Sequence, residues 1–312
     1  MFFRKSNSIV SGLEIRSTSV RFITVALKNR LWHVLAKSEI ELPEGVVKPS
    51  FNKKNIHKPA EFQDALDLLR AKIKKSKYPI GLSLPGESIK FSVKSFPKLP
   101  EGKENIRDMI LWSIGKSSII NPDTTRVRWA AFKNSKDDIS LNESNVIVMA
   151  GVASKSVITE YEDSLKNALF IPRAICSSDL NLFNFYSDII DEGGTVGWIG
   201  IFPETLSLFV FKDGSPLFYK NIKKGLITDN DADNIDMLIQ YCIDENPDLK
   251  IDRYYLSSAD TSFNNILSHT IFNSVKYELL SAFDLNSIEL ADKHTCCEYA
   301  SAVGAAWSTL SV

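Results

Sequence analysis

The sequence predicts an α/β protein with two similar lobes, and three observations support this prediction. The first is a strand-turn-strand pattern, in which the apolar run Ile9–Ile15 is broken at Ser17–Ser19 and resumes as the alternating stretch Val20–Leu27. The second is the return of the same layout, with a third strand, at 195–220. The third is that helical patterns alternate with strand patterns in both halves. The repeated unit therefore indicates a duplicated lobe.

Composition places the chain among folded proteins. Of its 312 residues, 44% are hydrophobic and 24% are charged, and the formal net charge is −1. This charge balance argues against a general nucleic-acid binder. No apolar run approaches the ~20 residues that a membrane-spanning helix needs, and no signal-peptide pattern opens the chain. The cysteines show no disulfide spacing, so we expect a reducing, cytosolic compartment with free thiols at Cys176, Cys242, Cys296 and Cys297.

The expected first lobe, residues 1–192, continues with a helix and a buried strand. The helix begins at about Pro59, and lysines in 72–77 lie at its end, where they suit the helix dipole. The strand spans Tyr78–Leu84 and is apolar enough to be buried on both faces. The apolar stripe of the helix is formed by Phe62, Leu66, Leu69 and Ile73.

An inserted α+β subdomain is expected within this lobe at about 85–153. Its strands alternate apolar and polar residues, which predicts a sheet with one face exposed to solvent. Between them lies a helical pattern over 106–114, and Asn134–Asn145 reads as a loop before the buried strand Val146–Val152. The polar positions that we expect to be exposed include Lys90, Lys94, Arg126 and Arg128.

The rest of the chain predicts a return to the main pattern, a second lobe over 193–292 and a C-terminal helical segment over 293–312. The last helix, Cys296–Leu310, is rich in Ala, Ser and Gly, and such small residues suit close packing between lobes. The other expected elements are helices around 157–169, 180–190, 233–245 and 263–267 and strands around 171–176, 252–257 and 275–279.

Several segments in this order resemble the PilM family, the actin-like proteins of type IV pilus assembly. The resemblance covers nearly the whole chain. It begins with the Phe- and Lys-rich start that leads into Ile15. The other segments that carry it are Ser17–Arg21, the Leu-Pro-Glu-Gly segment Leu42–Gly45, Leu84-Pro85, Asp213–Phe218 with the following Gly225, and the small-residue helix Tyr299–Ala306.

This resemblance implies a fold and a role. The fold would be actin-like, with two lobes around a cleft and the inserted subdomain on the first lobe. Such proteins dock the cytoplasmic N-terminal tail of PilN, a bitopic inner-membrane protein, and help to organise the inner-membrane platform with other pilus proteins. The chain would then be cytoplasmic and attached to the membrane through its partner.

The nucleotide motifs of such a cleft are altered here. Where the first phosphate loop of the family reads Asp-Ile-Gly-Ser, this chain has Glu14-Ile15-Arg16-Ser17, followed by Thr18. An arginine side chain thus stands where backbone N–H groups approach phosphate closely. The second loop has Trp198 in place of an acid, before Ile199 and Gly200. An indole neither binds magnesium nor orients water.

The adenosine motif is altered as well, since Ser257-Ser258-Ala259-Asp260 replaces a glycine pair. Three changed parts of one site argue against ordinary ATP hydrolysis, so we expect no catalytic residues, metal or cofactor. We hypothesise that Glu14 and Arg16 pair with each other, or that they line an empty cleft partly filled by Trp198. A solvent-facing Arg16 is the simpler alternative.

The remaining motifs give weaker indications of function. Gly115-Lys116-Ser117 resembles the end of a phosphate loop, but Ile110 stands where the motif needs glycine. The cluster His294–Cys297 lacks the further ligands of a tetrahedral metal site. No nucleophilic triad is legible.

The four basic positions of the inserted sheet have two interpretations. Lys90, Lys94, Arg126 and Arg128 form either a solvated sheet face or a docking face for an acidic partner or an anionic membrane. A partner tail could instead lie in the groove between this subdomain and the first lobe.

The sequence thus predicts a non-enzymatic scaffold that docks a PilN-like tail. The first alternative is an ATP-binding switch of the same machinery, with Mg-ATP held by the altered loops. The second is a relative of sugar or metabolite kinases, for which neither a phosphate loop nor a general base is legible.

Overall fold

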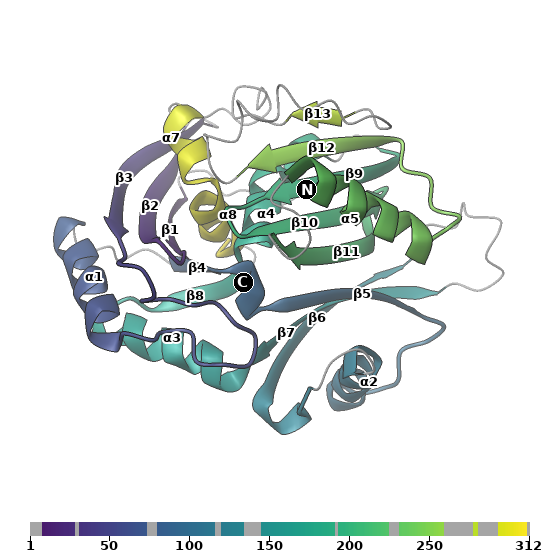
Figure 1. The fold of residues 1–312 in the computed structure, drawn as a ribbon, viewed down its shortest axis with the longest axis horizontal. Coiled ribbons are helices and arrows are strands. Elements are labelled where there is room, and N and C mark those ends of the chain that lie inside the picture. Colours follow the sequence, from purple (N-terminus) through teal and green to yellow (C-terminus); the bar gives the residue numbers. More distant parts are fainter. Residues whose placement is uncertain are drawn as a thin grey trace.

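A computed structural model describes residues 8–28, 31–73, 80–115, 120–133, 145–190, 193–224, 231–258, 277–279 and 293–310. Within these residues the chain forms two sheets of five strands and one sheet of three strands (Figure 1). No helix in these ranges is long and apolar enough to cross a membrane.

The first five-stranded sheet has the order β3-β2-β1-β4-β8. β1 pairs antiparallel with β2 and parallel with β4, and β4 pairs parallel with β8. The carboxyl ends of β1, β4 and β8 therefore meet at one edge of the sheet. The strands are β1 (Ile9–Ile15), β2 (Ser19–Lys28), β3 (Leu31–Glu41), β4 (Ile80–Leu84) and β8 (Pro172–Ser177).

The second five-stranded sheet repeats this topology in the order β11-β10-β9-β12-β13. Here β9 pairs antiparallel with β10 and parallel with β12, as β1 does with its neighbours. The two copies of the strand-turn-strand unit are therefore confirmed. The strands are β9 (Thr195–Ile201), β10 (Thr205–Lys212), β11 (Ser215–Lys223), β12 (Arg253–Ser258) and β13 (Tyr277–Leu279).

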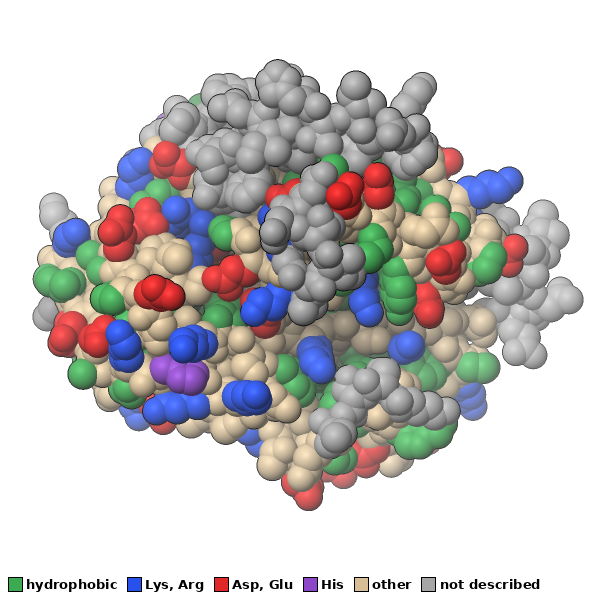
Figure 2. All heavy atoms as spheres, in the orientation of Figure 1, with side chains coloured by type: hydrophobic (Ala, Val, Ile, Leu, Met, Phe, Trp, Pro, Cys, Tyr) green, Lys and Arg blue, Asp and Glu red, His purple; other side chains and the backbone are tan. Residues whose placement is uncertain are grey.

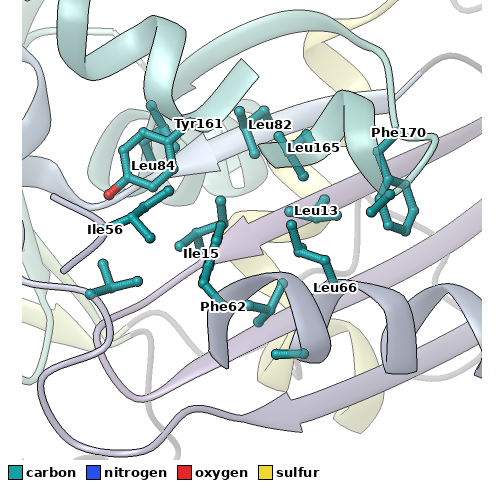
Figure 3. Packing of buried hydrophobic residues seen from close by; sticks show 14 of the residues in the cluster. Leu13, Ile15, Ile56, Phe62, Leu66, Leu82, Leu84, Tyr161, Leu165 and Phe170 are labelled. Atoms are coloured by element: carbon teal, nitrogen blue, oxygen red, sulfur yellow. The ribbon is translucent and has the colours of Figure 1, made fainter. Parts of the chain in front are cut away.

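Helices and sheets alternate in layers. α1 (Pro59–Lys72) and α3 (Lys155–Asn167) cover the outer face of the first sheet, and Figure 3 shows Leu66 of α1 beside Leu13 and Leu165 of α3 beside Leu82. α5 (Asp231–Glu245) covers the outer face of the second sheet. α4 (Ser178–Ile190) and α8 (Ala300–Ser308) lie between the two sheets and share one core with both.

Small residues bring α8 into backbone contact with the first sheet. A Cβ added at Gly12 of β1 would lie 1.7 Å from the carbonyl oxygen of Ala302, and one at Gly81 of β4 would lie 1.8 Å from that of Ala305. Both positions therefore require glycine. Their packing agrees with the close contact predicted for the last helix.

The C-terminal segment differs from the prediction in one respect. We expected one helix over Cys296–Leu310, but the chain forms α7 (Lys293–Glu298) and α8, separated at Tyr299. Tyr299 has φ −111° and ψ 22°, which interrupts the helix. Its ring lies 5.7 Å from the Arg21 guanidinium and 5.8 Å from the Lys37 ammonium, measured to the ring centre.

The inserted subdomain contains β5 (Lys90–Phe96), α2 (Lys103–Gly115), β6 (Thr125–Lys133) and β7 (Val146–Ser154). Its sheet has the order β5-β7-β6, and α2 covers one face. The other face packs against the second lobe, where the rings of Phe91 and Tyr219 lie 5.8 Å apart.

Most predicted elements are found within a few residues of their expected ends. Several predictions lie outside the described residues: the helix around 263–267, the lysines beyond Ile73, most of the loop Asn134–Asn145, Gly225, and Ala259-Asp260.

Candidate functional site: the cleft between the lobes

Two hairpin turns, one from each lobe, meet at the entrance of the cleft. The turn between β1 and β2 presents Ser17, and the turn between β9 and β10 presents Glu204. The Ser17 hydroxyl donates a hydrogen bond to Oε1 of Glu204. Each turn is closed by its own backbone bond, from Arg16 N to Ser19 O at 2.8 Å and from Phe202 N to Thr205 O at 3.0 Å. The two loops that would flank a phosphate chain therefore touch each other.

The space enclosed behind these turns is small. It measures about 50 Å³, which holds a few water molecules, whereas ligand pockets typically measure 300–1,000 Å³. Glu14, Arg16, Ser17 and Thr18 line the space from the first lobe, together with Pro85, Gly86, Glu87, Ser178 and, from the second lobe, Phe202–Thr205.

Glu14 and Arg16 form an ion pair at the carboxyl end of β1. Arg16 Nε lies 3.0 Å from Glu14 Oε1, the carboxylate is fully buried, and 12% of the arginine side chain is exposed. The two groups attract as charges without the alignment of a hydrogen bond. Of the alternatives drawn from the sequence, the paired arrangement is the one found, and Arg16 does not point to solvent.

Trp198 lies deeper, on the face of the second sheet that turns toward α4. Its indole is fully buried, and Nε1 donates to Ser257 Oγ on β12 at 2.8 Å. The ring covers Gly200, where an added Cβ would lie 2.4 Å from the indole. Phe183 of α4 packs edge-on against it, with 5.4 Å between the ring centres. Trp198, Gly200 and Ser257 thus form part of the shared core.

The predicted site residues therefore fall into two groups. Glu14, Arg16, Ser17 and Thr18 surround the small space at the turns, whereas Trp198, Gly200 and Ser257 pack in the core beyond it. Ser258 lies beside the end of β9, where its hydroxyl approaches the carbonyl oxygen of Ile201 at 3.4 Å.

Sequence reasoning missed the acids of this cleft. Asp179, in the first turn of α4, is fully buried and accepts hydrogen bonds from the Tyr219 hydroxyl and, at 3.0 Å, from the Ser207 hydroxyl. Glu87 follows β4, and burial raises its pKa above the usual range, with Glu204 and Asp179 adding to the effect and Lys223 opposing it.

A signal for two of these acids was present in the sequence. Glu87 comes three residues after the parallel strand β4, and Asp179 comes two residues after the parallel strand β8. Carboxyl ends of parallel strands are where open α/β sheets bind ligands. Glu204 has no such signal, since it lies in a hairpin turn of the other lobe.

The sheet register separates the four cations of the inserted subdomain. Through β7, Lys90 of β5 aligns with Val127 of β6, so both lie on the face that α2 covers. Lys94, four residues along β5, lies on the same face. Arg126 and Arg128 alternate with Val127 and lie on the opposite face. The predicted single basic stripe is therefore wrong, because β5 and β6 present even-numbered residues to opposite faces.

Arg126 is also engaged by the first lobe. Its Nη1 and Nη2 donate to the two carboxylate oxygens of Glu162 on α3 at 2.8 and 3.0 Å. This fork-to-fork pair raises the arginine pKa. Arg128 Nη1 donates to the carbonyl oxygen of Val127 at 3.2 Å. Arg126 thus ties the subdomain to α3 of the first lobe, whereas Arg128 contacts only its own strand in this bond.

The described residues contain no group of three His, Cys, Asp or Glu side chains arranged to hold a metal ion. Cys296 is buried and Cys297 half-buried, both as free thiols, and the side chain of His294 lies outside the described set. Gly115 ends α2, and the two residues that follow it in the phosphate-loop-like motif are likewise outside.

A larger cavity of about 410 Å³ lies elsewhere, between the inserted sheet, α4 and the second sheet. Most of its lining is apolar, with Met149, Leu180, Phe183 and Phe211 among the contributors and Asp213 as an acid. The cavity and the turns of the cleft have no lining residue in common.

Solved structures with the same arrangement of lobes give the fold a name. The chain superposes on a PilM-PilN type IV pilus biogenesis complex with a TM-score of 0.72 and 15% sequence identity, covering 96% of this chain and 98% of that one. It also superposes on a Bacteroides thetaiotaomicron protein with an actin-like ATPase fold and unknown function (TM-score 0.50, 10% identity, 88% of this chain and 91% of that one). The fold is actin-like.

A weaker structural likeness is to the cytoplasmic domain of EpsL, an inner-membrane component of the type II secretion system of Vibrio cholerae (TM-score 0.48, 10% identity, 80% of this chain and 82% of that one). A scan of the sequence against known protein families finds no match, and a search among curated proteins finds none either.

Proposed function

We propose that this protein is a scaffold of a type IV pilus or related secretion platform, which docks the cytoplasmic tail of a PilN-like membrane protein without using nucleotide. The observation that carries the proposal is the contact between the two hairpin turns, where Ser17 donates to Glu204 and about 50 Å³ remains behind them. A cleft closed in this way joins the lobes into one rigid body suited to holding a partner.

The chemistry of the cleft supports the same proposal. The Glu14 carboxylate is neutralised by Arg16 at 3.0 Å and would have to exchange this partner for a metal ion. At the second phosphate loop Trp198 is fully buried under Phe183 and bonded to Ser257, so the position offers no oxygen ligand. The acids nearest the two turns are both engaged, Glu14 with Arg16 and Glu204 with the Ser17 hydroxyl of the opposite turn, so a metal ion or an attacking water would have to displace these partners.

The partner is proposed from the structural likeness. A complex of PilM with PilN is similar to this chain over 96% of its length, so a tail of the PilN class is the first partner to test. A cytoplasmic position beside the inner membrane follows from that partner. The rival proposal is an ATP-binding switch of the same machinery, in which the turns separate to admit nucleotide.

The test is fluorescence anisotropy with a labelled peptide of a PilN-like N-terminal tail from the same genome, and a scrambled peptide as control. We expect saturable binding of the native order alone, with the same dissociation constant in the absence and presence of Mg-ATP. Failure of the tail to bind would remove the partner assignment. Binding that requires Mg-ATP, or that Mg-ATP abolishes, would favour the switch.

A further inference from the structure

A lysine-rich loop lies at the junction of the first lobe and the inserted subdomain. It joins β3 to α1 and carries Lys48, Lys53, Lys54 and Lys58, with His57 between them. All five side chains are exposed, and neither Asp nor Glu occurs from Gly45 to Ala60. Figure 2 shows Lys and Arg side chains gathered over this part of the molecule, with a histidine among them. A chain of net charge −1 thus concentrates positive charge at one place.

The loop is held in shape by a buried asparagine. The Asn55 amide nitrogen donates to the carbonyl oxygens of Ser50 at 2.8 Å and Lys53 at 2.7 Å. Its Oδ1 accepts from Ser50 N at 3.0 Å and from the hydroxyls of Ser88 at 2.9 Å and Tyr161 at 3.2 Å. The Asn55 side chain therefore holds the loop to itself, to the turn after β4 that carries Ser88, and to Tyr161 of α3.

A carboxylate of α3 fixes the same segment from below. Glu160 accepts hydrogen bonds from the backbone nitrogens of Asn55 and Ile56, each at 2.9 Å. Ile56 is buried in the first-lobe core and pairs with Val47 in an isolated antiparallel bridge. With its backbone fixed, the loop presents its lysines without a further ordering cost to the chain.

The inserted subdomain extends this surface. Lys90 of β5 lies with its ammonium 4.6 Å from the centre of the Phe51 ring, which belongs to the loop. Three acids lie near the surface: Glu61 pairs with Lys58 at 3.5 Å in a contact between exposed groups, Glu44 precedes the loop, and the half-buried Glu160 is turned to the loop backbone. We call the surface formed by Lys48, Lys53, Lys54, His57, Lys58 and Lys90 the basic face.

We propose that the basic face binds the anionic headgroups of a lipid bilayer directly. Its composition favours a membrane over a protein, because lysine is depleted and arginine enriched at protein interfaces, and the described basic face contains lysine and no arginine. Lysines suit a diffuse negative surface, where each contributes about fivefold in affinity. The face also lacks an open aromatic platform for stacking nucleic-acid bases, since Lys90 covers Phe51.

This inference is independent of the proposed function, because it requires neither a partner tail nor an empty nucleotide site. A direct lipid contact would add a second attachment to any provided by a membrane protein, and two weak attachments in one molecule reinforce each other. It would also orient the chain, with the junction of β3, α1 and β5 toward the bilayer.

The test is co-sedimentation of the full chain with vesicles of phosphatidylcholine, alone or with about 30% phosphatidylglycerol. We expect binding to the anionic vesicles only, and its loss between about 0.05 M and 0.5 M salt, because screening shortens the reach of exposed charges. Equal binding to both vesicles, or binding that resists salt, would overturn the proposal. Failure to bind vesicles, with retention of an acidic peptide or RNA instead, would overturn it as well.

A matched pair of triple variants locates the effect. Lys48→Glu/Lys53→Glu/Lys54→Glu should weaken vesicle binding by at least about a hundredfold, whereas the same charge change at three exposed lysines elsewhere should not. Equal losses in both variants would contradict a localised face. Should the first variant fail to fold, Lys53→Ala/Lys54→Ala decides, with an expected loss of roughly 25-fold. The control positions are Lys28, Lys103 and Lys250.

Discussion

At the scale of single residues, Trp198 is the side chain that links the second sheet to α4. The indole stands where the resembling family carries an acid, and it has become a core side chain that contacts Phe183 and bonds to Ser257. A residue with this environment contributes to stability. The indole therefore joins the second sheet to α4.

Truncation of this side chain tests that role. Trp198→Ala should lower the free energy of unfolding by about 3–5 kcal/mol, since it removes a fully buried indole and leaves a cavity. The control is Trp112→Ala on α2, where 66% of the side chain is exposed and the expected loss is about 0.5 kcal/mol or less. Urea denaturation measures both, and equal losses would contradict a structural role for Trp198.

Glu87 gives the cleft a predicted pH dependence. Burial raises the pKa of Glu87 in the folded state above the unfolded value near 4.5, so folding favours its protonated form. Its contribution to stability is therefore present at low pH and is lost as pH rises through the folded pKa.

The Glu87→Gln variant should remove this dependence. We expect the variant to be more stable than the original chain at pH 7 and the difference to vanish below about pH 4, where the carboxyl is protonated in both states. Urea denaturation at several pH values provides the measurement. A variant less stable than the original at pH 7 would mean that the charged carboxylate contributes favourably in the fold.

At the scale of elements, the packing of α8 depends on glycine at three backbone contacts. Gly12 and Gly81 leave room for its backbone, and on the other side Gly304 meets the carbonyl oxygen of Asn181, 1.8 Å from where a Cβ would stand. The helix thus contacts the first sheet and α4 without intervening side chains at these points.

Gly81→Ala tests this contact. The added methyl would meet the backbone of Ala305, which cannot move without shifting α8, so we expect a loss of about 3 kcal/mol or more in unfolding free energy. In Gly115→Ala the new methyl would meet nothing within 4 Å, and stability should be unchanged or slightly higher. A tolerated Gly81→Ala change, seen in thermal unfolding, would contradict the described packing.

The sequence predicts the positions of strands and helices better than it predicts how these elements pack against one another. Periodicity located β1, β2 and the matching β9 and β10, because apolar alternation reports burial within one strand. It placed Arg126 and Lys90 on one face wrongly, because the relative phase of β5 and β6 depends on their register with β7. The interruption of the C-terminal helix at Tyr299 was not predicted either. It accompanies contacts of the tyrosine ring with Arg21 and Lys37, which are distant in the sequence.

For the cleft, the sequence indicated which residues differ from the nucleotide motifs, but it did not indicate all the contacts that these residues make in the fold. The pairing of Glu14 with Arg16 was one of two hypotheses, since residues two apart on a strand share a face. The contact of Ser17 with Glu204 joins positions 187 residues apart, and no local pattern encodes it. Long-range contacts of this kind need the assembled lobes.

At the scale of the whole molecule, helices and sheets form five layers, with α4 and α8 at the centre and the cleft closed above them. The inserted sheet packs against the second lobe through Phe91 and Tyr219 and so bridges the two lobes from the side. The lobes are therefore in contact both at the hairpin turns and through the inserted sheet. Function would then depend on surfaces such as the basic face.

The most direct test of this account is thermal unfolding with and without millimolar Mg-ATP and Mg-ADP. A ligand at a hundred times its dissociation constant stabilises a protein by about 2.7 kcal/mol, which would raise the midpoint here by roughly 5–10 °C. We predict no shift, and none for Ser17→Ala either, because Arg16 still pairs with Glu14 beside the turns and Trp198 still offers no oxygen ligand for magnesium when the turns are released. A rise of several degrees with either nucleotide would contradict the central claim and identify a nucleotide-binding switch.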